Sequence, residues 1–155
     1  MRILVQRVRE ARVEVSGTIE AQIGAGLLLF VGFGKQDDPD FLVSRGWLAL
    51  CDKIWGLRVF PDAQGRFDLD VVQYGGGVLA VPQFTLYANC RRGRRPSFDA
   101  AAGGEAARQM FDGVCQRLEH RGGVPIGRGV FGADMEVGLT NWGPVTLWLD
   151  SLDFL

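Results

Sequence analysis

Residues 26–32, GLLLFVG, place five consecutive apolar side chains between two glycines. Neighbouring side chains of a strand point to opposite faces of its sheet, so a run without polar residues indicates a strand that is covered on both faces. The stretch therefore predicts a central strand at residues 27–31, with further structure packed on either side of the sheet.

Upstream of this strand, the sequence alternates between apolar and polar or charged residues. The alternation covers residues 2–8 and 11–15, Ser16-Gly17 follows as a turn signal, and residues 19–23 form another short segment of the same kind. A period of two is typical of half-buried strands, and a turn between two such runs favours antiparallel pairing. The N-terminal part is predicted to be a β-meander.

Two segments downstream have helical spacing instead. The first helix is predicted to begin at Asp38-Pro39, because a capping residue followed by proline is typical of a helix N-terminus. Its apolar residues recur three and four positions apart: Val43, Trp47, Leu50 and Ile54. The second helix is predicted at residues 104–119, and its apolar stripe has the same spacing: Ala107, Phe111, Val114 and Leu118.

The remaining apolar segments are short and predict strands at residues 57–60, 78–81, 135–139 and 145–149. Residues 141–144, between the last two, are predicted to form a tight hairpin turn. Neither a repeat nor a linker interrupts this order. We therefore predict an α/β fold: a single domain spanning residues 1–155, with mixed β-sheets packed against two main helices.

Composition narrows the class of function. The formal net charge is −1, so any contact with nucleic acid requires a local basic patch. The three cysteines have no CxxC spacing and the chain has one histidine, His120, so neither a metal nor another cofactor is expected. The N-terminus lacks the apolar core of a signal peptide, which predicts a cytoplasmic protein that does not contact a membrane.

Three segments carry residues that a core does not need. The first ends a strand with polar side chains, in Val81-Pro82-Gln83-Phe84-Thr85. The second, residues 89–98, has four arginines within five residues, and guanidinium groups on a loop pair well with phosphates. It equally suits a solvated loop or a subunit contact. The third is the Gly143-Pro144 connection, which is compatible with a plain hairpin turn.

Together these segments resemble the D-aminoacyl-tRNA deacylase family along nearly the whole chain. The resemblance rests on MRILVQRVREARVEV at residues 1–15, PQFTLYANCRRGRRPSF at 82–98 and FGADMEVGLTNWGPVTLWLDS at 131–151. It implies that family's fold, a homodimer, and hydrolysis of the ester bond of D-aminoacyl-tRNA, which releases the free D-amino acid and tRNA. Glycyl-tRNA mischarged on alanine tRNA is an implied second substrate, and no DNA partner is expected.

The resemblance also implies roles for individual residues. Gly143-Pro144 would form a cis peptide bond, enter the partner subunit's pocket and exclude L-amino acids, whereas glycine has no side chain to exclude. The catalytic segment would be Gln83, Phe84 and Thr85, whose backbone N–H groups would hold the developing oxyanion. Thr85 would act as a positioning group or as a nucleophile. Substrate binding and rejection of L-amino acids fall to Gly143, Pro144, Asn141, Val145, Thr146 and Met135. The expected tRNA contacts are Arg91, Arg92, Arg94 and Arg95.

The chain departs from the family pattern at Pro82, at Trp142 and in residues 65–70. A proline at position 82 is similar to a related branch whose Gly-Pro bond is trans and which removes L-alanine from mischarged threonine tRNA. Because the segment at 65–70 is altered, an alternative function is a module that binds the tRNA end without hydrolysing it. A small-ester hydrolase that uses Thr85 covalently is a third alternative. Met135 alternates with Val137 and Leu139, so it equally suits core packing.

Overall fold

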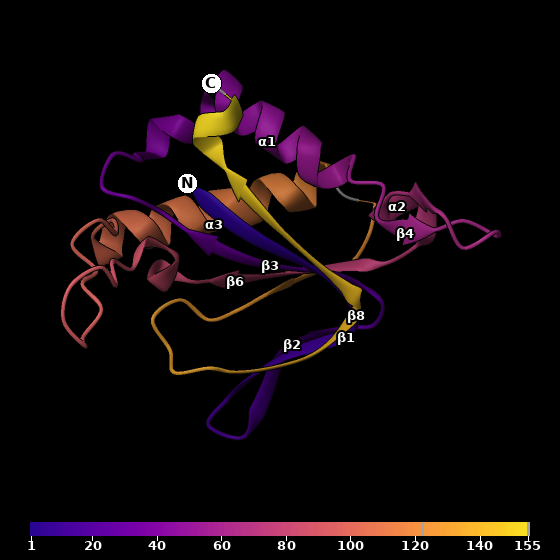
Figure 1. The fold of residues 1–155 in the computed structure, drawn as a ribbon, viewed down its shortest axis with the longest axis horizontal. Coiled ribbons are helices and arrows are strands. Elements are labelled where there is room, and N and C mark those ends of the chain that lie inside the picture. Colours follow the sequence, from indigo (N-terminus) through magenta and orange to yellow (C-terminus); the bar gives the residue numbers. More distant parts are fainter. Residues whose placement is uncertain (122, 155) are drawn as a thin grey trace.

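In the computed structural model, which describes residues 1–121 and 123–154, the main sheet is built around β1 (Arg2–Val15) (Figure 1). β8 (Glu136–Asp150) pairs antiparallel with β1 along nearly its whole length. β3 (Gly26–Gly32) and β2 (Thr18–Ile23) pair with successive halves of β1. Because a strand has two edges, β2 and β3 must share the one that β8 leaves. The predicted meander is confirmed in part: β1 and β2 pair antiparallel on either side of Ser16-Gly17, but residues 2–8 and 11–15 form one strand instead of two.

The rest of the sheet is parallel, so the sheet is mixed, as predicted. β6 (Gly77–Pro82) pairs with β3, and β7 (Ile126–Arg128) pairs with β6. Alternate residues of β3 belong to two different core clusters, Leu27 and Leu29 to the larger one and Leu28 to the smaller one. The prediction of a central strand covered on both faces is therefore confirmed.

The first helix begins later than predicted. Pro39–Val43 form a 3-10 turn, η1, and α1 spans Arg45–Trp55 after the N-cap Ser44, whose hydroxyl accepts a hydrogen bond from the backbone N–H of Trp47 at 3.2 Å. The proline fits the first turn of either kind of helix, and the serine cap decides where the α-helix starts. Val43, predicted to lie in the buried stripe, is 80% exposed.

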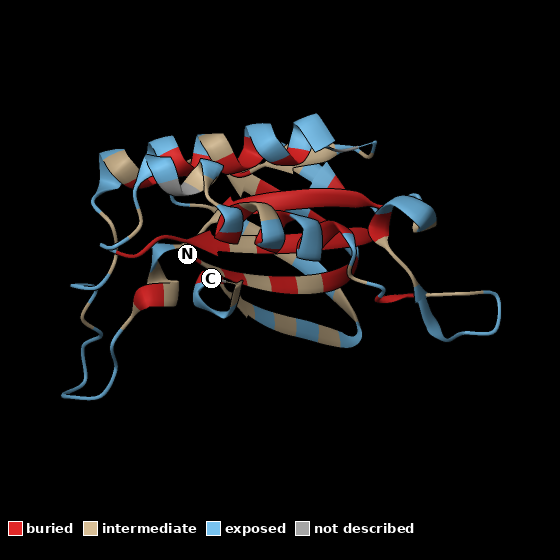
Figure 2. Cartoon of the chain, turned by 90° about the horizontal axis from the view of Figure 1, so that it is seen from above, coloured by how far each residue is buried: buried red, intermediate tan, exposed pale blue. Residues whose placement is uncertain are grey.

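The second helix, α3 (Gly104–Arg121), has the predicted buried stripe. Trp47 and Leu50 of α1 and Phe111 of α3 are buried in the larger core cluster against β1 and β3. The two main helices therefore cover one face of the sheet, and Figure 2 shows their exposed residues on the side away from the strands. None of the described helices is long and apolar enough to span a membrane.

The segment between the helices contains several short elements. The strand predicted at 57–60 is reduced to β4 (Phe60–Pro61), which pairs with β5 (Phe67–Leu69). A short helix, α2 (Val71–Tyr74), precedes β6. Two further 3-10 turns are η2 (Phe84–Tyr87), which follows β6, and η3 (Ser151–Phe154), which follows β8.

The predicted hairpin at 141–144 is wrong, because β8 is one continuous strand. Gln6 pairs with Thr146 and Val8 pairs with Asn141, so four residues of β8, numbers 142–145, lie opposite Arg7 alone. A hairpin would require the two halves of β8 to pair with each other, whereas each pairs with β1. Residues 142–145 therefore form an enlarged β-bulge of four residues, which we call the 142–145 bulge.

Candidate functional site

A largely apolar pocket of about 310 Å³ lies where β3 and β6 end. Val31 and Pro82 come from the strand ends, Gln83 and Phe84 from the start of η2, and Met135 from the segment before β8. Ligand pockets in α/β proteins commonly lie beyond the ends of parallel strands and combine apolar walls with a few polar groups. The pocket has these properties, with the polar groups at its η2 side.

Gln83 is held close to the end of β3. Its backbone N–H donates to Val31 O at 2.8 Å. Gly32 allows this approach, since a Cβ atom there would lie 2.7 Å from the carbonyl oxygen of Gln83. The backbone N–H groups of Phe84 and Thr85 belong to the first turn of η2, where N–H groups have no acceptor within the helix. They are therefore able to bind an oxygen atom of a ligand.

The side chains of Gln83 and Thr85 are hydrogen-bonded to each other. The amide Nε2 of Gln83 donates to the hydroxyl Oγ1 of Thr85. A hydroxyl that accepts such a bond still has its own hydrogen to donate, but an amide N–H cannot remove that hydrogen. This arrangement favours Thr85 as a positioning donor over Thr85 as an activated nucleophile.

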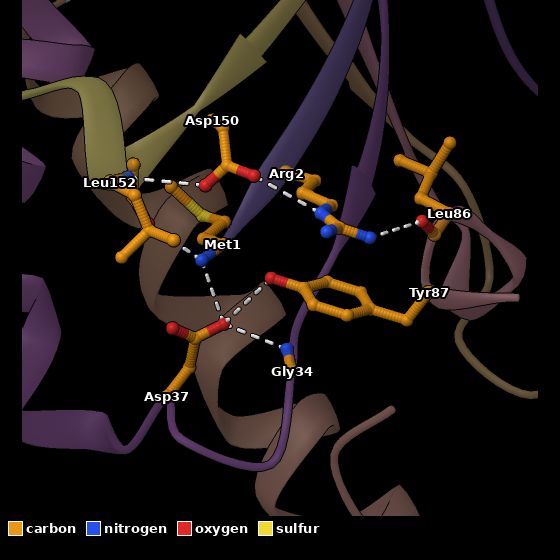
Figure 3. Close-up of polar contacts among 9 residues, drawn as sticks. Met1, Arg2, Gly34, Asp37, Leu86, Tyr87, Asp150 and Leu152 are labelled. Atoms are coloured by element: carbon orange, nitrogen blue, oxygen red, sulfur yellow. Dashed lines mark hydrogen bonds and ion pairs between the residues drawn. The ribbon is translucent and has the colours of Figure 1, made fainter. Parts of the chain in front are cut away.

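Arg2 fixes η2 to the sheet (Figure 3). Its guanidinium Nη1 donates to Leu86 O at 3.0 Å, and its Nε lies 3.1 Å from the Asp150 carboxylate. The same guanidinium lies 4.3 Å from the ring centre of Tyr87. One side chain therefore connects the first residues of β1, the end of β8 and the turn that carries Thr85.

The Asp37 carboxylate forms a second anchor for this turn (Figure 3). It accepts hydrogen bonds from the N–H of Gly34 at 2.7 Å and from the hydroxyl of Tyr87 at 3.4 Å. The ammonium group of Met1 lies 2.8 Å from the same carboxylate oxygen. Burial, and then the neighbouring charge of Asp37, raises the pKa of Tyr87, so the phenol stays protonated and donates.

Met135 occupies a position that is compatible with both of its expected roles. It lines the pocket and also packs against the smaller core cluster. Gly129 lies directly against it, since a Cβ atom at position 129 would be 3.3 Å from the Met135 sulfur and 3.1 Å from Pro82 Cδ. The proline that departs from the family pattern therefore forms part of this wall.

The 142–145 bulge is organised by Arg7. The Gly143-Pro144 peptide bond is cis, and Gly143 has a φ of +132°. Arg7 Nε donates to Trp142 O at 2.8 Å, and Nη1 donates to Val59 O. Arg7 Nη2 lies against Gly143, where a Cβ atom would approach it to 2.8 Å. Position 143 therefore requires glycine for its backbone conformation, and a side chain there would also displace the Arg7 guanidinium.

Two aromatic rings lie next to the same guanidinium. Trp142 is 4.4 Å and Phe67 is 4.8 Å from Arg7 Cζ, and the Trp142 ring is also 3.5 Å from Arg9 Cζ. Arg7 is only 4% exposed, and burial, followed by the nearby charge of Arg9, lowers its pKa. Two departures from the family pattern, at position 142 and in the 65–70 segment, thus meet at one residue.

Asn141 closes the base of the bulge. Its side-chain oxygen accepts from the N–H of Val145 at 2.8 Å, and its amide nitrogen donates to the hydroxyl of Thr146 at 2.9 Å. These bonds replace the ladder that the bulge interrupts, while Gly143 and Pro144 remain exposed. The expected role of Asn141, Val145 and Thr146 in substrate binding is untested by this geometry, which shows them supporting the turn.

Within one chain the bulge and the pocket lie apart. Gln83 follows the end of β6, beside the β3 end that pairs with Arg2, whereas the bulge lies opposite Arg7. Five residues along β1 correspond to about 17 Å at the rise of a strand. The pocket lining includes neither Gly143 nor Pro144. The structure brings together Gln83, Phe84, Thr85 and Met135, but not the predicted turn.

The four-arginine segment forms an exposed loop between η2 and α3 (Figure 1). Reciprocal backbone bonds of 2.7 and 3.0 Å between Asn89 and Ser97 close its base. Arg91, Arg92, Arg94 and Arg95 are all exposed, and the ion pairs recorded for the described residues involve none of them. We call residues 89–97 the arginine loop.

Sequence reasoning did not assign roles to Arg2 and Arg7. A signal for Arg7 was present, because it continues the inward positions of Ile3 and Val5, where a charged residue requires partners. Arg2 had no comparable signal, since its partners Leu86 and Asp150 are far away in the sequence.

Known proteins resemble the chain over nearly its full length. The sequence profile of the D-Tyr-tRNA(Tyr) deacylase family matches residues 4–150. A D-aminoacyl-tRNA deacylase of Nitratidesulfovibrio vulgaris is 51% identical over 153 residues, which cover 99% of this chain and 94% of that protein.

Two solved structures have a similar fold. A c-Myc DNA Unwinding Element Binding Protein has a TM-score of 0.86 at 33% identity, covering 97% of this chain and 98% of that chain. A probable eukaryotic D-amino acid tRNA deacylase shares the fold, with a TM-score of 0.76 at 15% identity, covering 96% and 97% of the two chains. The chain belongs to the D-Tyr-tRNA(Tyr) deacylase family.

Proposed function

We propose that this protein hydrolyses the ester bond of D-aminoacyl-tRNA, releasing the free D-amino acid and tRNA. The observation that carries the proposal is the pocket with the hydrogen-bonded Gln83-Thr85 pair at its rim. The arginine loop is linked to it by Phe98, whose ring contacts the pocket residue Phe84. The apolar interior suits the terminal nucleoside, the rim suits the ester, and the exposed arginines suit RNA phosphates. Relatives named D-aminoacyl-tRNA deacylase support the same substrate class. We place the activity in the cytoplasm, where tRNA is charged.

The ester chemistry that we propose needs no metal and no covalent intermediate. The N–H groups of Phe84 and Thr85 hold the carbonyl oxygen as it gains negative charge, a contribution of about 10²–10³ in rate per donor in other enzymes. The Thr85 hydroxyl, oriented by Gln83, donates a hydrogen bond to the substrate ester. Aminoacyl esters of ribose are labile, so a water molecule organised by the neighbouring 2′-hydroxyl attacks the carbonyl carbon without a strong protein base. The bond between that carbon and the ribose oxygen breaks, and the proton released by the water passes to the ribose oxygen, which leaves the free amino acid and tRNA.

We further propose a homodimer in which each subunit inserts Gly143-Pro144 into the other's pocket. The support is geometric: the bulge is exposed, and it lies about 17 Å along β1 from its own chain's pocket. Carbonyl oxygens of the inserted turn would capture the substrate ammonium group and leave no room for an L side chain. Glycine has no side chain to exclude, so glycyl-tRNA mischarged on alanine tRNA is a second substrate.

A deacylation assay tests this function. D-tyrosyl-tRNA and glycyl-tRNA are expected to lose their amino acid without added metal, while L-tyrosyl-tRNA stays intact. Equal hydrolysis of both tyrosyl enantiomers would refute stereochemical control. Sedimentation analysis tests the dimer, and a monomer with full selectivity would refute insertion of the turn across subunits.

The same assay separates the alternatives. Hydrolysis of L-alanyl-tRNA charged on threonine tRNA, with D-tyrosyl-tRNA untouched, would assign the chain to the branch that removes L-alanine. Salt-sensitive tRNA binding without hydrolysis would indicate a binding module. An acyl adduct that disappears in Thr85→Val would indicate a covalent ester hydrolase. A DNA duplex serves as the control partner and is expected not to compete with tRNA.

A further inference from the structure

Two exposed phenylalanines lie between the pocket and the arginine loop. Phe84 is 56% exposed and Phe98 is 37% exposed, and their ring centres are 4.9 Å apart in an edge-to-face arrangement. Phe84 lines the pocket, whereas Phe98 follows Ser97, which closes the arginine loop. The core clusters formed by the described residues contain neither ring. The proposed ester chemistry uses the backbone of Phe84 and leaves both rings without a role.

The surroundings of the two rings indicate what covers them. Four arginines without recorded ion-pair partners precede Phe98 within the same loop, so the pair stands in a locally positive part of a chain whose net charge is −1. Unpaired nucleotides carry both features that match this surface, a negatively charged backbone and a flat base. An apolar protein segment would match the rings but not the arginines.

We propose that Phe84 and Phe98 form a stacking platform for the unpaired nucleotide that precedes the terminal nucleoside of the tRNA. The inference rests on the proposed function, because the pocket is assigned to the terminal nucleoside there. Because the two ring planes are 67° apart, one base can lie flat on only one of them. The preceding base stacks on the Phe98 ring, which the Phe84 ring supports from the pocket side, and its phosphate faces the arginine loop. The platform recognises any base, since every base has a flat face.

Two substrates of different size test the platform. Wild type, Phe98→Ala and Phe98→Trp are assayed with D-tyrosyl-tRNA and with D-tyrosyl-adenosine, which lacks the preceding nucleotide. Loss of one stacked base is expected to raise the KM of Phe98→Ala for tRNA about 10-fold. We expect an unchanged kcat, unchanged kinetics with D-tyrosyl-adenosine, and rescue by Phe98→Trp. Ile19→Ala, which shortens an apolar side chain that is 52% exposed on β2, is the matched control and should leave both substrates unaffected.

Other outcomes overturn the inference. A similar loss with both substrates would mean that the Phe98 ring supports the Phe84 backbone, and an unchanged KM for tRNA would mean that no base stacks there. A changed sedimentation coefficient at unchanged KM would make the rings a subunit contact.

A binding measurement keeps the inference separate from the proposed function. If the wild type hydrolyses neither substrate, the proposed function fails, and the platform is judged by affinity for a short unpaired oligoribonucleotide. About 10-fold weaker binding by Phe98→Ala, restored by Phe98→Trp, would support the platform. Equal binding by all three proteins would overturn it.

Discussion

Replacing Arg7 by methionine removes the cation that joins the 142–145 bulge to the rest of the molecule. The variant loses two hydrogen bonds from a charged donor, to Trp142 O and Val59 O, and two contacts with aromatic rings. Hydrogen bonds of this kind contribute about 1.5–3 kcal/mol each, and methionine regains part of the apolar contact. We therefore expect the free energy of unfolding to fall by about 3 kcal/mol, which corresponds to a Tm lower by about 6–12 °C.

The same change is expected to weaken stereochemical control. Without Arg7 the bulge loses the bond to Trp142 O and the packing against Gly143, so the turn that we assign to exclusion of L side chains gains freedom. Hydrolysis of L-tyrosyl-tRNA should rise relative to D-tyrosyl-tRNA. Thermal unfolding followed by calorimetry, together with deacylation of both enantiomers, measures the two effects.

Arg12→Met is the matched control, because Arg12 lies on the same strand and its side chain is exposed. A surface change of this kind usually alters stability by no more than about 0.5 kcal/mol. The reasoning is refuted if the Tm of Arg7→Met lies within about 2 °C of the Tm of Arg12→Met. It is also refuted in its functional part if the variant is destabilised but rejects L-tyrosyl-tRNA as well as the wild type does.

Three further predictions follow from local contacts. If the four loop arginines each neutralise one phosphate, their replacement by alanine should flatten the plot of log binding constant against log salt by about 3, measured by fluorescence anisotropy with tRNA; an unchanged slope would remove the loop from the tRNA contact. Asp70→Ala breaks the capping box in which the Asp70 carboxylate accepts from Gln73 N at 2.8 Å, so stability should fall by about 1 kcal/mol in a denaturant titration, and an unchanged midpoint would contradict this. Burial raises the pKa of Cys51, and raises that of Cys115 to about 12, so both thiols stay protonated at neutral and mildly alkaline pH. A thiol reagent should therefore modify exposed Cys90 first, and mass spectrometry that finds Cys115 modified in the folded protein would count against it.

Local sequence patterns correctly predicted those helices and strands whose burial can be read from their own apolar residues. The apolar run at 27–31 predicted a strand buried on both faces, and the apolar stripe at 104–119 predicted a helix packed against a sheet. Both predictions were confirmed. The prediction that Val43 is buried in the first helix was wrong. A proline fits the first turn of α-helices and of 3-10 turns alike, and the start of the α-helix depends on one capping side chain, Ser44.

Pairing partners were beyond the reach of local patterns. The Gly143-Pro144 segment has every signal of a hairpin, yet both of its flanks pair with β1, and nothing within residues 135–149 identifies that partner. The contacts of the candidate site are of two kinds, those between sequence neighbours and those that depend on strand pairing. Gln83 and Thr85 are near neighbours in sequence and meet in the structure, whereas the contacts of Arg7 with Val59 and Trp142 depend on the register of the sheet.

The attachment of the 142–145 bulge at both ends has a consequence for how its position responds to heating. The tip of a hairpin can swing about one stem, but this turn is flanked by the Asn141 and Thr146 pairs, both made with the same strand. It can move only if one flank separates from β1. If the bulge excludes L side chains as we propose, hydrolysis of L-tyrosyl-tRNA should stay constant as the protein is warmed. It should rise only at the temperature at which β8 begins to separate from β1.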